Sequence, residues 1–217
     1  MLKIVVYDGG RGGELFASHL KEQLPLVEII PIIDKSHPEL LHCSKRKARA
    51  IVRKAIAAHI GKVDLIIIAN HFITATSLDY LRDKYPGQKF IGFSLPQPDT
   101  FVNRPTLVLT TSSLEHRLVF KRYVRGLRRE SKILSPDQLI SKIDDGSINY
   151  CDVRKIIVQR AKIKPSELIL ACSHYSALIS SLRLAYGRSL KIHDSYAETC
   201  HEVYRTLKIR GYYKKRK

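Results

Sequence analysis

The chain has 217 residues, of which 44% are hydrophobic and 27% are charged. This length can bury the core of one large domain or of two compact halves, so a substantial enzyme is possible and a small disulfide-stapled scaffold is excluded. No apolar run approaches the roughly 20 residues that span a bilayer, and the short apolar stretch after Met1 lacks a signal-peptide cleavage site. We therefore expect a cytoplasmic protein without a membrane span.

Four cysteines are scattered along the chain without a CxxC pair: Cys43, Cys151, Cys172 and Cys200. This usage fits reduced thiols better than a disulfide framework or a zinc site. The adjacent pairs His42–Cys43 and Cys200–His201 have diverging side chains, so we interpret them as structural rather than as metal ligands. No metal site is expected, whereas catalytic use of one thiol stays open.

The net charge is unusual, because 38 Lys and Arg residues face 20 Asp and Glu residues and leave a surplus of +18. A surplus of this size produces a strong positive electrostatic field, which favours anionic partners. The surplus is concentrated in segments 45–54, 117–132 and 208–217. Either a nucleic-acid surface or solvated helix faces with a frayed tail would produce these runs. We favour the second interpretation because no recognised nucleic-acid motif accompanies the charge, so nucleic acid is a permitted but not a favoured partner.

An internal repeat organises the chain. Segment 64–72 (DLIIIANHF) aligns with segment 167–175 (ELILACSHY) at an offset of 103 residues. Segment 3–10 aligns with segment 106–113 at the same offset, so two separate strands repeat in register. Each repeat begins with a short continuous apolar run, as expected for a strand that is buried on both faces of a parallel sheet.

Helix-like spacing of apolar residues predicts helices in seven segments: 15–24, 44–60, 77–85, 114–127, 135–143, 153–161 and 196–207. Strands that alternate with helices imply parallel βαβ units. We therefore expect an α/β fold of two pseudo-symmetric parallel-sheet halves, residues 1–95 and 96–189, with the active-site cleft between them. Residues 190–217 would form a carboxyl-terminal strand and helix that pack back on the first half, followed by a basic tail. Loop 94–100 is the best candidate hinge.

Ligands of such sheets bind beyond the carboxyl ends of the strands. A glycine cluster, residues 9–13, lies at the first of these ends and precedes a helix, so its amides could hold an anionic group such as a carboxylate. It is not a dinucleotide fingerprint, because Leu15 stands where GxGxxG needs its third glycine, and no P-loop is present. A tight turn without a ligand is the alternative.

Cys172 lies one residue past the apolar run 168–171, with His174 two positions later and a helix-forming stretch after it. A helix amino terminus or a protonated histidine lowers the pKa of a thiol, which makes the thiolate competent as a base. A buried inert cysteine is the alternative. His71 and His174 occupy equivalent positions of the repeat, which favours a functional role for both histidines.

Three segments resemble motifs of the glutamate racemases in the aspartate/glutamate racemase superfamily. Segment 7–13 (YDGGRGG) resembles the amino-terminal FDSGVGG motif, segment 171–175 (ACSHY) resembles GCTHY, and segment 194–199 (DSYAET) resembles DSGEAT. The motifs occur in family order and reach nearly from one end of the chain to the other. The second is the most specific, because it carries cysteine and histidine at the family spacing.

The resemblance implies a substrate held between two cysteines, which deprotonate one face of the α-carbon and reprotonate the other without a cofactor. It assigns Cys172 as one of the pair, His174 as its acid/base partner and Asp8 as the carboxylate that assists on the other side. Asp144 stands where the family often places a glutamate that assists the second histidine. The substrate-binding residues that it implies are Gly9, Gly10, Asn70, Thr110, Thr111 and Ser173.

The chain departs from the family pattern at four points. Ala69 occupies the position of the first cysteine, His71 follows Asn70 in place of threonine, Gly9 follows Asp8 in place of serine, and no PYG-like motif follows Asp34. Alanine cannot carry a proton. Either His71 or Asp8 serves that face of the substrate, or two-sided racemisation has been lost.

The leading hypothesis is a cofactor-independent racemase that interconverts L- and D-glutamate or a related acidic amino acid, an activity that serves peptidoglycan biosynthesis. A second hypothesis is a single-cysteine decarboxylase or isomerase on a small dicarboxylate, because some decarboxylases of the superfamily protonate an enolate with one cysteine of the second half. The third is a non-catalytic racemase-like protein that binds anionic partners through its basic surface. The oligomeric state stays open, with a homodimer as one option.

Overall fold

The computed structural model describes residues 1–37, 40, 43–96, 104–127 and 131–209. His42, residues 97–100 of the expected hinge, residues 128–130 of the second basic segment and the tail from residue 210 lie outside this part. The chain divides into two compact units, one formed by Met1–Ser94 with Tyr196–Lys217 and the other by Leu95–Ser195. None of the described helices is long and apolar enough to cross a membrane.

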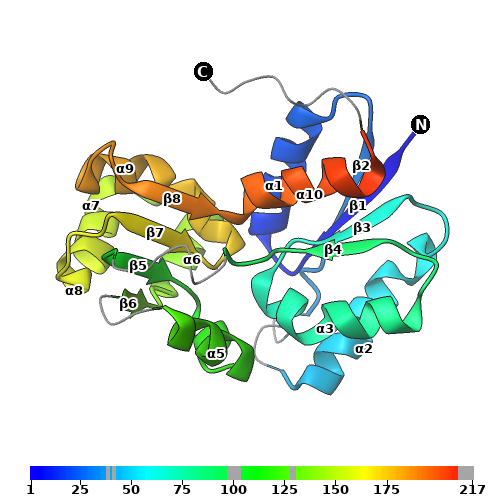
Figure 1. Ribbon diagram of the computed structural model, residues 1–217, viewed down its shortest axis with the longest axis horizontal. Coiled ribbons are helices and arrows are strands. Elements are labelled where there is room, and N and C mark those ends of the chain that lie inside the picture. Colours follow the sequence, from blue (N-terminus) through cyan, green and yellow to red (C-terminus); the bar gives the residue numbers. More distant parts are fainter. Residues whose placement is uncertain (38–39, 41–42, 97–103, 128–130, 210–217) are drawn as a thin grey trace. The chain divides into compact units, whose positions relative to one another are not determined.

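The first unit contains a four-stranded parallel sheet in the order β2-β1-β3-β4 (Figure 1). Its strands are β1 (Lys3–Asp8), β2 (Glu28–Ile33), β3 (Leu65–Ile68) and β4 (Phe90–Gly92). Its helices are α1 (Arg11–Gln23), α2 (Lys45–Ile56), the short 3-10 helix η2 (Ala57–His59), α3 (His71–Lys84) and α10 (Ser195–Leu207). Pro31 lies in β2, where the missing N–H is tolerated because β2 is an edge strand.

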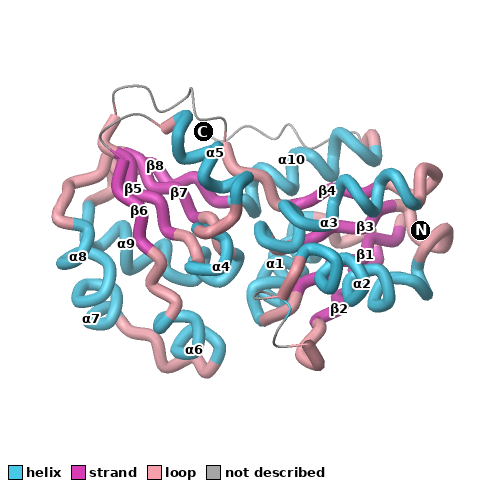
Figure 2. The backbone as a smooth tube through the Cα atoms, turned by 90° about the horizontal axis from the view of Figure 1, so that it is seen from below, coloured by secondary structure: helices cyan, strands magenta, loops and turns pink. Residues whose placement is uncertain are grey.

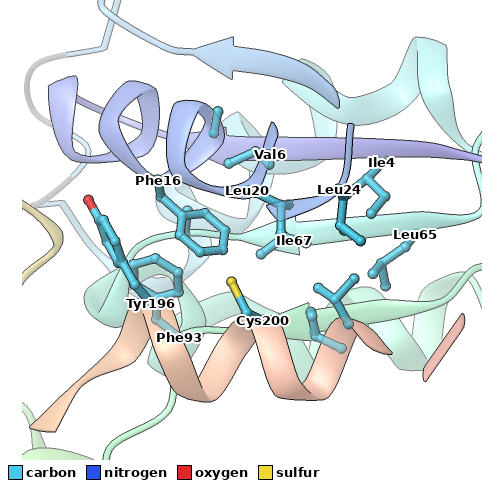
Figure 3. Close-up of a cluster of buried hydrophobic side chains, with 14 residues drawn as sticks. Ile4, Val6, Phe16, Leu20, Leu24, Leu65, Ile67, Phe93, Tyr196 and Cys200 are labelled. Atoms are coloured by element: carbon cyan, nitrogen blue, oxygen red, sulfur yellow. The ribbon is translucent and has the colours of Figure 1, made fainter. Parts of the chain in front are cut away.

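Successive side chains of the central strands pack against different helices, because side chains alternate between the faces of a sheet. Ile4 and Ile67 lie in one hydrophobic cluster with residues of α1 and α10. Val5 and Ile68 lie in another cluster with residues of α2 and α3. Figure 3 shows the first cluster, in which Phe16 packs edge-on against Phe93 at 4.9 Å between ring centroids. The first sheet is therefore buried on both faces.

Helix α10 completes the first unit from the far end of the chain. Tyr196, Cys200 and Val203 are buried in the cluster that α1 forms with the sheet. The Tyr196 hydroxyl also donates a hydrogen bond to the carbonyl oxygen of Gly12 at 3.1 Å. The chain thus leaves the first unit after Ser94 and returns to it at Tyr196.

The second unit contains a parallel sheet in the order β6-β5-β7-β8 (Figure 1). Figure 2 shows its strands in magenta and its helices in cyan. Its strands are β5 (Thr106–Leu109), β6 (Ser131–Leu134), β7 (Glu167–Leu170) and β8 (Lys191–Asp194). Its helices are α4 (Ser112–Glu115), α5 (Leu118–Gly126), α6 (Gln138–Asp144), α7 (Tyr150–Val153), the π-helix η4 (Arg154–Val158), α8 (Gln159–Ala161), the 3-10 helix η5 (Ser173–Leu178) and α9 (Ile179–Tyr186). Leu107, Leu109, Leu168 and Leu170 pack in one cluster with the helices from α6 to α9.

The two sheets share both strand order and register. Three pairs of Cα partners in the first sheet have counterparts 103 residues later in the second: Ile4–Leu65 and Leu107–Leu168, Lys3–Glu28 and Thr106–Ser131, and Ile66–Phe90 and Ile169–His193. The offset that the sequence showed for two strands therefore holds for all four. The predicted α/β fold of two similar parallel-sheet halves is confirmed.

The expected assignment of the carboxyl-terminal strand to the first half is wrong. Strand β8 pairs with β7, with Leu168 opposite Ile192, so it belongs to the sheet of the second unit. Only α10, which follows β8 directly, packs in the first unit. The physical reason is the repeat itself, since β8 occupies in the second sheet the edge that β4 occupies in the first.

Gly13, in the first turn of α1, provides a test of this packing. A Cβ atom at Gly13 would lie 2.3 Å from the Cβ of Asp8. Alanine normally stabilises a helix relative to glycine, but here we expect Gly13→Ala to lower the free energy of unfolding by about 1–3 kcal/mol through overpacking. Urea or thermal unfolding measures this. Gly87→Ala is the control, because a Cβ there meets nothing within 4 Å; equal stabilities of the two variants would contradict the close contact.

Candidate active site

Asp8 is the central polar group at the carboxyl edge of the first sheet. It ends β1 and is fully buried. Its Oδ1 atom accepts hydrogen bonds from the Gly9 amide at 2.6 Å and from the Asn70 side-chain amide at 2.9 Å. Asn70 also caps α3, because its Oδ1 accepts a hydrogen bond from the Ile73 amide at 3.1 Å. The carboxylate, the glycine turn and the start of α3 are thereby linked.

The glycine cluster forms the turn between β1 and α1. Gly10 is the N-cap of α1, and no side chain caps this helix end. Gly12 and Gly13 lie within the first turn of α1 rather than in a loop. A Cβ at Gly9 would lie 3.2 Å from the Leu40 side chain, so the turn passes close to its neighbour. Binding of an anionic group by Gly9 and Gly10 stays a prediction.

His71 is the first residue of α3 and is almost completely buried. Its ring packs edge-on against Phe93 at 5.5 Å between centroids. Burial lowers the pKa of His71 to about 3. The imidazole is therefore neutral near pH 7, where it is a weak base and a poor proton donor. Ala69, two residues earlier, is buried at the position equivalent to Cys172.

Three side chains in the second unit form a line from thiol to imidazole to carboxylate. Cys172 follows β7 by two residues, and its Sγ atom lies 3.7 Å from Nδ1 of His174. Nε2 of His174 lies 3.2 Å from an Oδ1 atom of Asp144, the last residue of α6. The structure thus brings together two predicted site residues and the carboxylate that the family resemblance implied.

Burial and the Asp144 carboxylate act in opposite directions on the basicity of His174, and burial is the larger effect. Burial lowers the pKa of His174, although the nearby charge of Asp144 acts in the opposite direction. A carboxylate beside Nε2 favours the tautomer with its proton on Nε2, which leaves Nδ1 able to accept the thiol proton. Asp144 also stabilises the imidazolium that this transfer produces. The arrangement can generate a thiolate in a largely buried setting.

The remaining predicted residues of the second unit lie around the same edge of the sheet. Thr110 is fully buried after β5, and its hydroxyl is without a hydrogen-bond partner among the described residues. Its carbonyl oxygen accepts a hydrogen bond from the Tyr175 hydroxyl at 3.1 Å. Thr111 caps α4 through the Leu114 amide, and Ser173 is buried at the start of η5. Their roles in substrate binding stay predictions.

Two carboxylates near these strand ends were not identified as functional groups from the sequence. Asp34 follows β2 and accepts hydrogen bonds from the hydroxyls of Tyr7 at 3.2 Å and Ser36 at 2.6 Å, while Nδ1 of His37 lies 2.8 Å away. Burial alone would raise the pKa of Asp34, but the hydrogen bonds from Ser36 and His37 outweigh it and hold the pKa below its usual value. Asp34 therefore remains ionised near pH 7.

Asp137 is the counterpart of Asp34 in the second unit, 103 residues later. It accepts hydrogen bonds from both the amide and the hydroxyl of Ser112, the first residue of α4. In each unit, an aspartate in the loop after an edge strand therefore accepts a hydrogen bond from a residue at or just after the end of a central strand. The offset of 103 residues between Asp34 and Asp137 is the sequence signal from which both carboxylates could have been predicted.

No group of three or more potential metal ligands occurs among the residues that the structure describes.

The chain is similar over nearly its whole length to racemases of known structure and sequence. The glutamate racemase of Deinococcus radiodurans is 24% identical over 223 residues, which covers 97% of this chain and 76% of the relative. The structure of Escherichia coli glutamate racemase in complex with L-glutamate and its activator superposes with a TM-score of 0.80 at 17% identity, covering 96% of this chain and 83% of that one. Picrophilus torridus aspartate racemase superposes with a TM-score of 0.65 at 15% identity, covering 95% and 94%. No protein-family model matches the chain.

The repeated α/β fold is therefore the fold of these racemase structures. In sequence, the chain is similar to glutamate racemases, at 24% identity to two of them. Ala69 occupies the position of the first cysteine expected from the family motif, and this substitution separates the chain from the two-cysteine pattern.

The line from Cys172 to Asp144 predicts a specific pH dependence of thiol alkylation. We expect His174→Ala to raise the pH midpoint of Cys172 alkylation, because the thiolate loses the imidazolium that stabilises it. Asp144→Asn should raise the midpoint less, because it makes the imidazolium form of His174 less stable but leaves the imidazole in place. Iodoacetamide labelling followed by peptide mass spectrometry gives the midpoint for each thiol.

Cys151 serves as the internal control of this experiment, because it is exposed and lies away from His174 in the sequence. Because Cys151 is exposed and Cys172 is buried, their absolute labelling rates differ in accessibility as well as in reactivity. The two thiols are therefore compared by the pH midpoints of their alkylation. A Cys172 midpoint that does not change in His174→Ala would show that the 3.7 Å contact does not activate the thiol.

Proposed function

We propose that this protein is a cofactor-independent isomerase of the glutamate racemase type, which moves the α-hydrogen of an acidic amino acid. The observation that carries the proposal is the line of Cys172, His174 and Asp144 at the carboxyl edge of the second sheet. Its similarity in sequence to glutamate racemases and its likeness to a racemase structure that contains L-glutamate support this substrate class.

The proposed reaction uses Cys172 as the base. His174 accepts the thiol proton at Nδ1, and the thiolate then removes the α-hydrogen to leave a planar carbanionic intermediate. Such a hydrogen is very weakly acidic, so the site must exclude water and provide a preorganised environment. The burial of Cys172 and His174 is consistent with this requirement. Return of the proton from the Cys172 thiol to the same face regenerates the original enantiomer.

Inversion requires a proton donor for the opposite face of the intermediate. The repeat-equivalent residue of Cys172 is Ala69, which cannot donate a proton. His71 is neutral because burial depresses its pKa to about 3, so it supplies a proton poorly. Asp8 is fully buried, and it already accepts hydrogen bonds from Gly9 and Asn70. We therefore propose that exchange at one face is faster than racemisation.

A second candidate is a one-base lyase that removes CO₂ from a small dicarboxylate and protonates the resulting enolate with Cys172. The specific observation in its favour is that the second unit holds a complete proton-transfer line whereas the equivalent position of the first unit is Ala69. Release of CO₂ from a substituted malonate distinguishes this reaction from racemisation, in which carbon is conserved.

Deuterium exchange tests the asymmetry between the two faces. In D₂O, we expect the protein to exchange the α-hydrogen of one enantiomer of glutamate or aspartate with retention of configuration. Cys172→Ala should abolish this exchange, because it removes the base. Proton NMR follows the exchange, and chiral chromatography of the same sample follows inversion. Racemisation as fast as exchange, and unaffected in His71→Ala, would show that a second base other than His71 is at work.

Ala69→Cys is the complementary test. The variant restores a thiol at the position where the family resemblance expects the first cysteine, so inversion should rise relative to exchange. A tenfold rise corresponds to a decrease of about 1.4 kcal/mol in the barrier for inversion. Ala69→Ser is the matched control, since it adds a side chain of similar size without a comparable acid. If Ala69→Cys still exchanges the α-hydrogen but shows no gain of inversion, the proposal that residue 69 lies at the face of the substrate opposite Cys172 is contradicted.

A further inference from the structure

Helix α2 presents cationic side chains to solvent without any anionic ones. Its twelve residues, KRKARAIVRKAI, include six Lys or Arg and no Asp or Glu. Ala48, Ile51, Val52 and Ile56 are buried in the cluster with α3 and the sheet. The exposed cationic residues, which we call the α2 basic face, are Lys45, Arg46, Lys47, Arg53 and Lys54.

The positions of these charges oppose the stability of α2. Lys45, Arg46 and Lys47 occupy the first turn, where the helix dipole is positive and no acidic residue is present. Arg49 and Arg53 are four residues apart, a spacing at which like charges repel. The Ser44 hydroxyl, which accepts a hydrogen bond from the Lys47 amide at 3.2 Å, caps this end. Helix stability therefore does not account for the α2 basic face.

Packing accounts for the cationic side chain of Arg49. Arg49 donates a hydrogen bond from Nε to the carbonyl oxygen of Thr76 at 3.0 Å, and its guanidinium lies 4.9 Å from the ring centroid of Tyr80. It thus fastens α2 to α3. Arg46 and Arg53, by contrast, make no ion pair with any residue in the part of the chain that the structure describes. These two guanidinium groups are free to meet an anionic partner.

The spacing of the exposed cations fits an extended polyanion. Arg46 and Arg53 are seven residues apart, which places them on the same side of the helix about 10 Å apart along its axis. Guanidinium groups bind phosphate oxygens in a bidentate manner. Ala50 is the exposed apolar residue of α2, and none of the exposed large hydrophobic residues in the described part of the chain belongs to this helix, so α2 has no large apolar side chain to insert into a membrane.

We propose that the α2 basic face binds the phosphate backbone of duplex nucleic acid without reading its sequence. No aromatic side chain occurs in α2, so it offers no platform on which unpaired bases could stack. The net charge of +18 strengthens the attraction and accelerates the encounter. This binding is separate from the chemistry of Cys172, because the α2 basic face belongs to the first unit and uses none of the residues of the proton-transfer line.

Salt-dependent binding to a fluorescent mixed-sequence DNA duplex of about 20 base pairs, two helical turns, tests the proposal. The test variant is Arg46→Gln with Arg53→Gln, which keeps good helix formers. The control is Lys164→Gln with Arg188→Gln, two exposed residues of the second unit, which removes the same charge. Each phosphate contact contributes about 0.9 to the slope of log affinity against log salt concentration, so the test variant should lose about 1.8 of that slope and the control should not.

Unfolding of the test variant is excluded by its melting temperature, which we expect to stay equal or rise, because Arg46→Gln removes an unfavourable charge from the start of α2. Equal losses of slope in the test and control variants would overturn the proposal, since the attraction would then be a property of the whole charge. Absence of duplex binding at about 50 mM salt would also overturn it. Binding to phosphatidylserine vesicles without binding to the duplex would assign the α2 basic face to a membrane surface instead.

Discussion

Parallel pairing of the strands is the constraint on which the rest of each unit depends. Because every strand of a parallel sheet runs the same way, all the carboxyl ends reach one edge, and the helices that return the chain cover the faces. Asp8 and Asn70 are 62 residues apart in the sequence, yet they are joined by a hydrogen bond because β1 and β3 are neighbours. Cys172 lies beside the end of β5 for the same reason. The order of the strands therefore determines which positions of each unit lie together at the carboxyl edge, whatever side chains occupy them.

The sequence predicts those parts of the fold that carry a local signal. The central strands β1, β3, β5 and β7 are continuous apolar runs, and their repetition at one offset predicts two similar sheets. The edge strands lack this signal: β2 contains Pro31, β4 has three residues, and the residues of β6 are only partly buried. The sequence places β8 in the wrong half, because the pairing partner of this strand is determined by the sheet and not by the strand's own residues. The start of α3 at His71 was missed because Asn70, which caps it, is a polar residue outside the apolar pattern.

The candidate site could be predicted in its residue types but not in its electrostatics. Cys172 and His174 stand in a recognisable motif, whereas their contact and the approach of Asp144 depend on the way η5 and α6 pack together. His71 and His174 are equivalent in the repeat, and the sequence therefore suggested similar roles. Their surroundings differ, since His174 has a carboxylate at Nε2 and His71 packs against Phe93. A duplicated position thus keeps its backbone geometry while burial and neighbouring charge change what its side chain can do.

The return of the chain at α10 has a consequence for synthesis on the ribosome. The second unit is one continuous segment, so its sheet can close as soon as β8 has emerged. The first unit lacks Tyr196, Cys200 and Val203 until α10 is made, and Phe16 and Leu20 of α1 remain without part of their apolar cover for the intervening stretch. The unit that is translated first is therefore the one that completes its core last. During that interval its exposed apolar surface is open to chaperones and to wrong partners, and a truncation within α10 would damage the amino-terminal unit rather than the segment next to the break.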